Sequence, residues 1–220
     1  MNKAVIFDLD GTLIDSLGDI HAALNDVLQF RNAPPLALAT VRGLIGKGSA
    51  NLVRRALTAQ NLAIDEASCA SALADFLRLY SADSAKLTTI FDGAIDALDR
   101  LRDGGFCLGI CTNKPLAPTK IVLDQFGLTR FFDTIVGGDQ LASRKPDPAM
   151  LFHAMACLGT TSCLFVGDSE IDRETAAAAG QPFALFTKGY RTSSIEMLNP
   201  EYYFYEYSEL TNIVNLNIRN

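Results

Sequence analysis

The sequence predicts an α/β fold: a Rossmann-like parallel sheet core with helices on both faces, plus an inserted α-helical cap domain. Short apolar runs recur along the chain, each run ends at a polar cluster, and amphipathic helical patterns separate the later runs. The runs are apolar throughout, which is typical of strands buried on both faces of a parallel sheet. A long stretch rich in Ala and Leu after the first run predicts the helical insertion.

The core elements follow one another in a regular order. Strands are expected at the apolar runs 4–8, 106–113, 134–139, 163–169 and 183–189, and a last strand is expected within the tyrosine-rich stretch 201–210. Segment 92–105 has apolar residues at helical spacing, with Asp92 as its expected N-cap. Segments 118–127 and 147–159 begin near a proline, which suits the first turn of a helix.

The stretch 16–105, between the first two strands, is too long for one crossover helix. Apolar residues recur at helical spacing in its first part, in segments 16–30, 49–60 and 67–80. We therefore expect a helical cap domain at 16–84 and a core domain formed by 1–15 and 85–220.

Composition excludes several classes of protein. The 220 residues carry a net charge of −6 and the pI is about 4.9, which argues against a surface dedicated to nucleic acid or to an anionic membrane. The five cysteines are odd in number and mostly lie in apolar stretches, as expected of buried side chains in a reducing compartment. The sequence contains neither an apolar run of about 18 residues nor a basic-then-apolar leader. A cytoplasmic protein, monomeric or homodimeric, is expected.

Polar side chains gather where the predicted strands end. They are Asp8 and Asp10 after the first strand, Thr112 and Asn113 after the second, and Asp168 and Asp172 after the fourth. Ligands of parallel α/β sheets bind beyond the carboxyl ends of the strands, so we expect these side chains to converge. Lys145 precedes a helix that leads into the fourth strand and is expected at the same edge.

This combination of side chains suits phosphoryl chemistry. Carboxylates gathered in one crevice repel one another, and a hard cation removes the conflict. Mg²⁺ is expected rather than zinc, because the cluster offers oxygen ligands without His or Cys. A metal, a lysine and a hydroxyl around an acidic pair can hold a phosphoryl group. Of two aspartates two residues apart, one can act as a nucleophile and the other can protonate the leaving oxygen.

The motifs resemble those of the haloacid dehalogenase superfamily in type, order and spacing. The similar segments are "DLDGT" at 8–12, "CTN" at 111–113, "RKP" at 144–146 and "GDSEID" at 167–172. The resemblance implies that Asp8 is the nucleophile and Asp10 the general acid/base. It assigns the phosphoryl group to Thr112 and Lys145, and Mg²⁺ to Asp8, the backbone carbonyl of Asp10, and Asp168, with Asp172 supporting the ion through water.

The inserted segment is similar to one type of cap found in that superfamily. "GLIGKGSANLVRRAL" at 43–57 resembles the cap of bacterial phosphoglycolate phosphatases, as does "TNKP" at 112–115. The resemblance implies hydrolysis of a small phosphorylated metabolite through an aspartyl-phosphate, with 2-phosphoglycolate as the expected substrate. The residues expected to face the substrate are Thr112, Asn113, Gly46, Lys47 and Gly48. The glycine-flanked loop is also compatible with a simple turn between helices.

Other activities stay open at this point. Phosphatases of sugar phosphates, nucleotides or pyrophosphate share much of the pattern. A hydrolytic dehalogenase needs no acid at the position of Asp10, and a non-catalytic module needs no carboxylate cluster. A hexose-phosphate mutase is disfavoured because Ile20 stands where similar mutases have a hinge histidine. His21 is expected to pack or face solvent, and at least one of Arg54 and Arg55 is expected on a solvated face.

Overall fold

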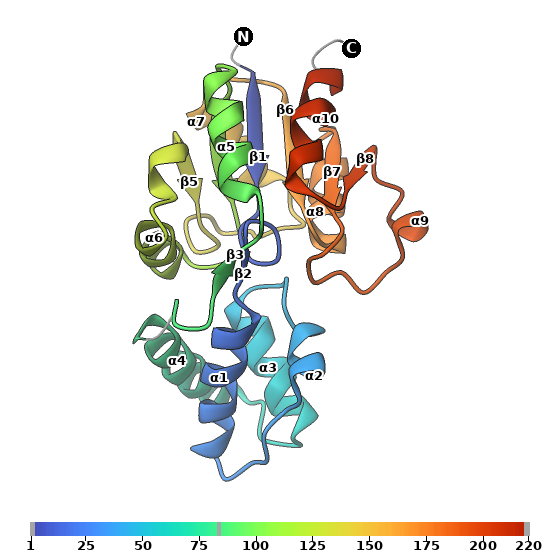
Figure 1. Ribbon diagram of the computed structural model, residues 1–220. Helices are drawn as coiled ribbons and strands as arrows, with labels where there is room; N and C mark the ends of the chain where they lie inside the picture. Colours follow the sequence, from blue (N-terminus) through green and yellow to red (C-terminus); the bar gives the residue numbers. More distant parts are fainter. Residues whose placement is uncertain (1–2, 83–84, 218–220) are drawn as a thin grey trace.

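The computed structural model describes residues 3–82 and 85–217, and its centre is a six-stranded parallel sheet in the order β5-β4-β1-β6-β7-β8 (Figure 1). The strands are β1 (Ala4–Phe7), β4 (Cys107–Cys111), β5 (Thr134–Val136), β6 (Cys163–Gly167), β7 (Phe183–Phe186) and β8 (Tyr202–Phe204). Each predicted run contains one of these strands, and each strand ends before the polar cluster that follows it. The predicted α/β fold is therefore confirmed.

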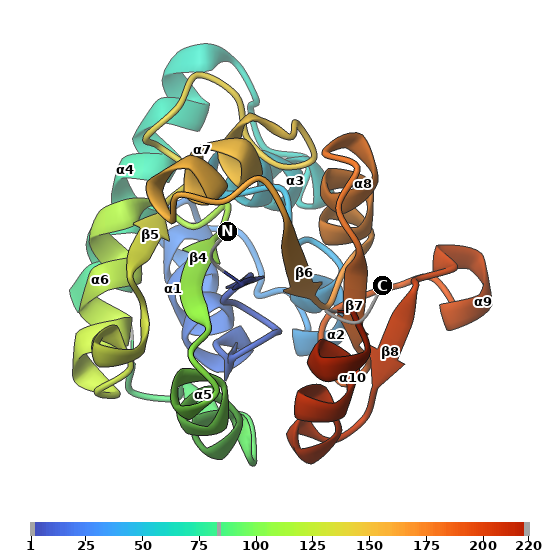
Figure 2. The ribbon, with the colours of Figure 1, turned by 90° about the horizontal axis from the view of Figure 1, so that it is seen from above.

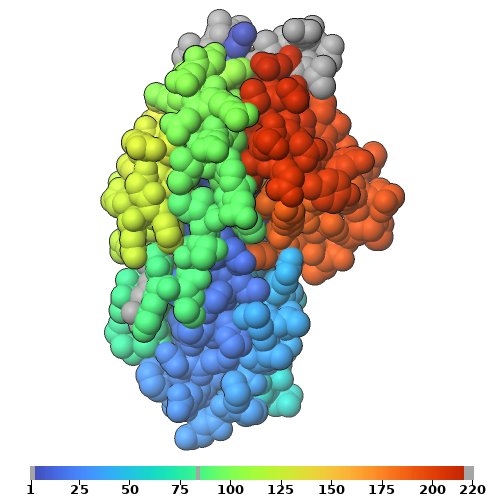
Figure 3. Space-filling model, in the orientation of Figure 1, coloured from blue at the N-terminus to red at the C-terminus, as the bar shows by residue number. Residues whose placement is uncertain are grey.

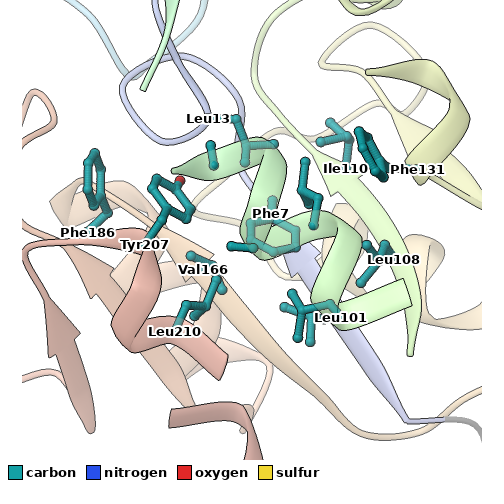
Figure 4. Packing of buried hydrophobic residues seen from close by; sticks show 14 of the residues in the cluster. Phe7, Leu13, Leu101, Leu108, Ile110, Phe131, Val166, Phe186, Tyr207 and Leu210 are labelled. Atoms are coloured by element: carbon teal, nitrogen blue, oxygen red, sulfur yellow. The ribbon is translucent and has the colours of Figure 1, made fainter. Parts of the chain in front are cut away.

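Helices cover both faces of the sheet because alternate strand residues point to opposite sides. In β1, Val5 and Phe7 belong to a core shared with α5, α6 and α10, whereas Ala4 and Ile6 belong to one shared with α7 and α8. Figure 2 shows the two layers along the strands, and Figure 4 shows Phe7 within the first core. The helices are α5 (Ala94–Asp103), α6 (Leu116–Gln125), α7 (Ala149–Cys157), α8 (Glu170–Ala178) and α10 (Leu210–Asn217).

The strand order creates a switch point at β1. The chain moves from β1 to β4 and β5 on one side, then crosses back to β6 on the other side of β1. The carboxyl ends of these strands face the helical insertion (Figure 1). Ligands of open α/β sheets bind at such a point, so the topology places the polar clusters of three strands around one crevice.

The inserted segment forms a helical unit with a core of its own. Its helices are α1 (Leu17–Gln29), α2 (Leu38–Arg42), α3 (Ser49–Ala59) and α4 (Glu66–Ala82). Tyr190, from the loop after β7, also packs into this core, so the unit rests directly against the sheet domain (Figure 3). The domain boundary expected at residue 84 falls on residues 83–84, which lie outside the described residues, so the exact division stays a prediction.

The joint between the two parts contains elements that the sequence pattern did not predict. A short antiparallel pair, β2 (Ile14–Asp15) and β3 (Thr89–Ile90), joins the outgoing and returning chains. Asp19 fixes this joint from α1, because its carboxylate accepts hydrogen bonds from the N–H groups of Leu87 and Thr88, both at 2.9 Å. The remaining short elements are η1 (Thr129–Phe131), α9 (Ile195–Leu198) and η2 (Tyr207–Glu209).

One predicted helix cap is wrong. Gly93, not Asp92, is the N-cap of α5, and no side chain caps this end. Gly93 has a φ of 77°, a left-handed conformation that favours glycine, and the turn it makes leaves Asp92 outside the helix. Within the described part of the chain, no helix combines the length and apolar character needed to cross a bilayer.

Candidate active site

Asp8 and Asp10 lie immediately beyond β1, where the chain turns toward the helical unit. The N–H of Asp8 still donates to the carbonyl of Val166 at 2.8 Å, so the sheet fixes the backbone that carries this carboxylate. Gly11 makes the turn possible with a φ of 88°, and a Cβ there would lie 2.5 Å from Asp168 Oδ2. Glycine at this position therefore lets the turn in "DLDGT" pass directly against Asp168, which follows β6.

Lys145 is the positive centre of this crevice. Its Nζ lies 2.9 Å from Asp8 Oδ1 and 2.6 Å from Asp172 Oδ1, and the residue is only 4% exposed. Burial opposes its charge, but Asp172 and Asp8 outweigh burial and raise the pKa of Lys145 above its ordinary value. Burial raises the pKa of Asp8 to about 6 despite the opposing attraction of Lys145, and Asp172 adds to the rise. The single positive charge of Lys145 therefore does not balance the negative charges of the carboxylates around it.

Asp168 and Asp172 are held rigidly by their neighbours. Asp168 accepts hydrogen bonds from Thr12 Oγ1 at 2.8 Å and from the N–H of Tyr190 at 2.6 Å. Asp172 is both a helix cap and an ion-pair partner: its Oδ2 completes a capping box with Ser169, and its Oδ1 meets Lys145. Its two oxygens therefore have separate partners, the N-terminus of α8 and Lys145.

The carboxylates fit a hard cation. Asp8, Asp168 and Asp172 each place one oxygen within 4.8 Å of the others, and all three residues are buried. Among the described residues, no donor forms a well-directed hydrogen bond with Asp8 Oδ1, although Lys145 Nζ lies 2.9 Å away. Burial, followed by the charges of Asp172 and Asp8, raises the pKa of Asp168 well above its ordinary value. A bound cation relieves this repulsion and uses oxygen donors of the type that Mg²⁺ prefers.

Asp10 has a different set of partners. Its Oδ1 accepts hydrogen bonds from Ser16 Oγ at 2.6 Å and from Lys114 Nζ at 2.9 Å. Lys114 also donates to the hydroxyl of Tyr80 on α4, so a core lysine links Asp10 to the helical unit. The sequence pattern missed Lys114 and Tyr80. The only available signal was the position of Lys114 directly after Thr112 and Asn113.

Thr112 and Asn113, which follow β4, have different positions in the site. Thr112 is 2% exposed and lines the same cavity as Asp8 and Asp10. Asn113 instead connects the parts of the molecule: its Nδ2 donates to the carbonyls of Gly46 and Lys145, both at 2.9 Å, and its Oδ1 accepts from the N–H of Lys145. The Asn113 side chain therefore holds the loop that carries Lys145 against the loop of residues 46–48, called the "GKG" loop below.

Two hollows meet at the carboxylates. A small cavity of about 60 Å³ is lined by Asp8, Asp10, Thr112, Gly46 and Gly48, together with apolar side chains of the helical unit. A larger cleft of about 250 Å³ adjoins Asp168 and the exposed Lys47 and Arg55. Gly46 and Gly48 thus border the small cavity, whereas the Lys47 side chain lies on the larger cleft.

The remaining candidate residues have structural partners. His21 Nε2 lies 2.9 Å from the carbonyl of Leu36 and so fixes the loop after α1. Arg54 is exposed and donates to the carbonyl of Ile64, while Arg55 donates to that of Leu44. The prediction that His21 packs or faces solvent agrees with this geometry.

Comparison with known proteins identifies the relatives of this chain. Residues 5–186 match the family of haloacid dehalogenase-like hydrolases. A phosphoglycolate phosphatase of Cereibacter sphaeroides is 44% identical over 210 residues, 96% of each chain, and one of Rhodobacter capsulatus is 41% identical over 214 residues, 97% of each chain. The crystal structure of a predicted phosphoglycolate phosphatase from Haemophilus somnus superposes with a TM-score of 0.89 at 28% identity, over 96% of this chain and 97% of the other.

Proposed function

The chain belongs to the haloacid dehalogenase-like hydrolase family, and from this membership we propose that it is a Mg²⁺-dependent phosphatase. Its proposed substrate is a small phosphomonoester, 2-phosphoglycolate, which is hydrolysed to glycolate and phosphate. The observation that carries the proposal is the buried Asp8 carboxylate, which the sheet holds against Lys145 and beside Asp10. The names of the relatives support the substrate.

In the proposed reaction, a carboxylate oxygen of Asp8 attacks phosphorus. A bond forms between this oxygen and phosphorus, and the bond to the leaving oxygen breaks, which yields an aspartyl-phosphate. Lys145 neutralises charge on the phosphoryl oxygens, and the Thr112 hydroxyl donates to one of them. Water then attacks phosphorus, and the Asp8 carboxylate and free phosphate are released.

Asp10 acts as the proton donor and later as the proton acceptor. Ser16 and Lys114 hold its Oδ1, while its Oδ2 has no hydrogen-bond partner among the described residues. The free oxygen gives a proton to the leaving alkoxide and afterwards takes one from the attacking water. One held oxygen and one free oxygen are the arrangement that this double role requires.

Asp8, the backbone carbonyl of Asp10, and Asp168 are the proposed holders of Mg²⁺, with Asp172 supporting the ion through water. When bound, the ion neutralises negative charge on the cluster and on the phosphoryl oxygens.

The size of the cavity supports a small leaving group. The hollow beside Asp10 encloses about 60 Å³, and a single water needs roughly 10–15 Å³ of such space. A two-carbon acid fits within these limits. Hydrolysis of p-nitrophenyl phosphate with and without Mg²⁺, followed by a panel of phosphorylated metabolites ranked by kcat/KM, tests the proposal. Activity on chloroacetate but not on any phosphomonoester would instead identify a dehalogenase.

Replacement of the proton donor should depend on the leaving group. We expect Asp10→Asn to lower kcat/KM for 2-phosphoglycolate by about a hundredfold or more, since an alkoxide needs protonation as it departs. The loss for p-nitrophenyl phosphate should be smaller, because p-nitrophenolate leaves without a proton. Steady-state kinetics on both substrates provide the measurement. Equal losses on the two substrates would indicate that Asp10 acts only as a structural anchor for Ser16 and Lys114.

The "GKG" loop should affect catalysis because its two glycines line the small cavity. Gly48 has a φ of 81°, and a Cβ there would lie 3.3 Å from the carbonyl oxygen of Asn113. We expect Gly48→Val to push the loop from the site and to lower kcat/KM for 2-phosphoglycolate by about tenfold to a hundredfold. The effect on p-nitrophenyl phosphate should be smaller. Gly127→Val is the matched control, since Gly127 has a φ of 64° but open space around it. Similar losses from both variants would mean that backbone strain, not the site, is responsible.

A further inference from the structure

We propose that Lys114 and Tyr80, with the N-terminus of α3, form an anion subsite that recognises a carboxylate on the leaving group. The inference rests on the proposed phosphatase function and names the residues that select its substrate. Lys114 comes from the loop after β4, and Tyr80 and α3 come from the helical unit. All three border the small cavity beside Asp10.

Lys114 keeps donor capacity for a ligand. The residue is 6% exposed, and its Nζ donates to Asp10 Oδ1 and to the Tyr80 hydroxyl. An ammonium group has three N–H donors, and the third has no partner among the described residues. A buried donor next to a cavity is stabilised by an acceptor placed there.

Tyr80 offers a second donor. Its hydroxyl oxygen accepts the hydrogen bond from Lys114, and its own proton has no acceptor in the described part of the chain. The ring is stacked on Phe76 and lies 4.5 Å from Lys114 Nζ, which fixes the hydroxyl at the cavity wall. Burial raises the pKa of Tyr80 to about 12, so the hydroxyl keeps its proton at neutral pH.

The start of α3 supplies the third component. Gly48 and Ser49 line the cavity, and Gly48 is an N-cap without a side-chain hydrogen bond. The first N–H groups of a helix lack acceptors within the helix and carry partial positive charge. Besides Asp8, Asp10, Thr112 and Asn113, the wall contains four apolar side chains, Ile20, Ile45, Leu52 and Phe76. Apolar side chains lower the local dielectric, which strengthens hydrogen bonds between the donors and an anion.

The exposed Lys47 is the alternative reader of a carboxylate. It lines the larger cleft, which also borders Asp10, and it does not line the small cavity that contains Lys114 and Tyr80. Lys114 is buried and already fixed by two partners, so it loses less conformational freedom when it binds a ligand. We therefore assign the recognition to Lys114.

The test compares 2-phosphoglycolate with ethyl phosphate, which has the same carbon skeleton but no carboxylate. The selectivity is the ratio of the two kcat/KM values, measured for the wild type, Lys114→Met, Tyr80→Phe and Lys120→Met. Lys120 is exposed on α6, so Lys120→Met removes the same charge away from the cavity. We expect the wild type to prefer 2-phosphoglycolate at least tenfold. Lys114→Met should reduce the ratio by about tenfold or more and Tyr80→Phe by several-fold, while Lys120→Met leaves it unchanged.

The outcomes separate this inference from the proposed function. No Mg²⁺-dependent hydrolysis of p-nitrophenyl phosphate by the wild type would overturn the function itself. Wild-type hydrolysis without preference for the carboxylate would overturn only the subsite. A folded Lys114→Met variant that loses both activities in parallel would also overturn it, because Lys114 would then act solely through Asp10. If Lys114→Met does not fold, the ratio for Tyr80→Phe decides, since this change removes one hydroxyl.

Discussion

Replacement of Asp8 by asparagine should abolish turnover and leave the fold intact. An amide cannot form the acyl phosphate, and loss of a covalent nucleophile typically costs a thousandfold or more, so we expect kcat to fall by at least about that factor. The fold should survive because burial disfavours the charge of Asp8, raising its pKa to about 6, and the amide has almost the same volume. Lys145 keeps its ion pair with Asp172 at 2.6 Å. Initial rates on p-nitrophenyl phosphate and a thermal melting curve provide the measurements.

The control for this experiment is Asp99→Asn, which makes the same chemical change at an exposed position of α5. It should retain wild-type turnover. Mass spectrometry of the Asp8→Asn protein excludes deamidation, which would regenerate the nucleophile. Turnover within tenfold of the wild type in a verified asparagine variant would show that Asp8 is not the nucleophile.

The elements and the acidic cluster were predictable because they depend on short-range patterns. An apolar run followed by a carboxylate is visible within a few residues, as in "AVIFDLD". Parallel strands then bring their carboxyl ends together whatever the loops between them do. Asp8, Asp168 and Asp172 therefore meet as their positions at strand ends predict. The sequence did not predict that Asp172 caps α8 and pairs with Lys145, because the second contact joins residues 27 positions apart.

The partners of Asp10 were not predictable in the same way. Lys114 lies 104 positions from Asp10 in sequence, and Tyr80 lies 34 positions from Lys114. Their contacts depend on how the helical unit settles on the sheet domain. Spacing within one helix does not determine that placement. The helical pattern around Tyr80 indicates a buried face of α4, but not that one hydroxyl on this face reaches a core lysine.

The contact between Tyr190 and the chain that enters the helical unit was also not predictable from local sequence. Its hydroxyl accepts hydrogen bonds from the N–H groups of Ser16 and Leu17 and donates to Asp15. These groups begin α1, more than 170 positions earlier in the chain. The loop after β7 thus holds the start of the helical unit, although nothing in its local sequence suggests a contact of this range.

Removal of divalent cations should eliminate activity and lower thermal stability. We expect turnover in excess chelator to fall below about a hundredth of its value in Mg²⁺ and to recover when Mg²⁺ is restored. Ca²⁺ should compete without restoring activity, because its larger and more flexible shell is a poor substitute for octahedral Mg²⁺. Mg²⁺ should also raise the Tm of the chelator-treated protein, since it relieves repulsion among Asp8, Asp168 and Asp172. The melting curve reports binding independently of catalysis.

Asp168→Asn separates a specific site from general binding of cations to an acidic protein. Asp168 is 1% exposed, and burial together with its carboxylate neighbours raises its pKa. Its amide variant should retain the fold, because asparagine keeps an oxygen for Thr12 or Tyr190, yet it should lose both activity and the Mg²⁺-dependent rise in Tm. Asp99→Asn, with the same change in charge, should retain both. Full activity in excess chelator, with metal shown to be absent by elemental analysis, would refute the proposed Mg²⁺ dependence and favour the dehalogenase alternative, because attack by a carboxylate on a carbon–halogen bond needs no cation.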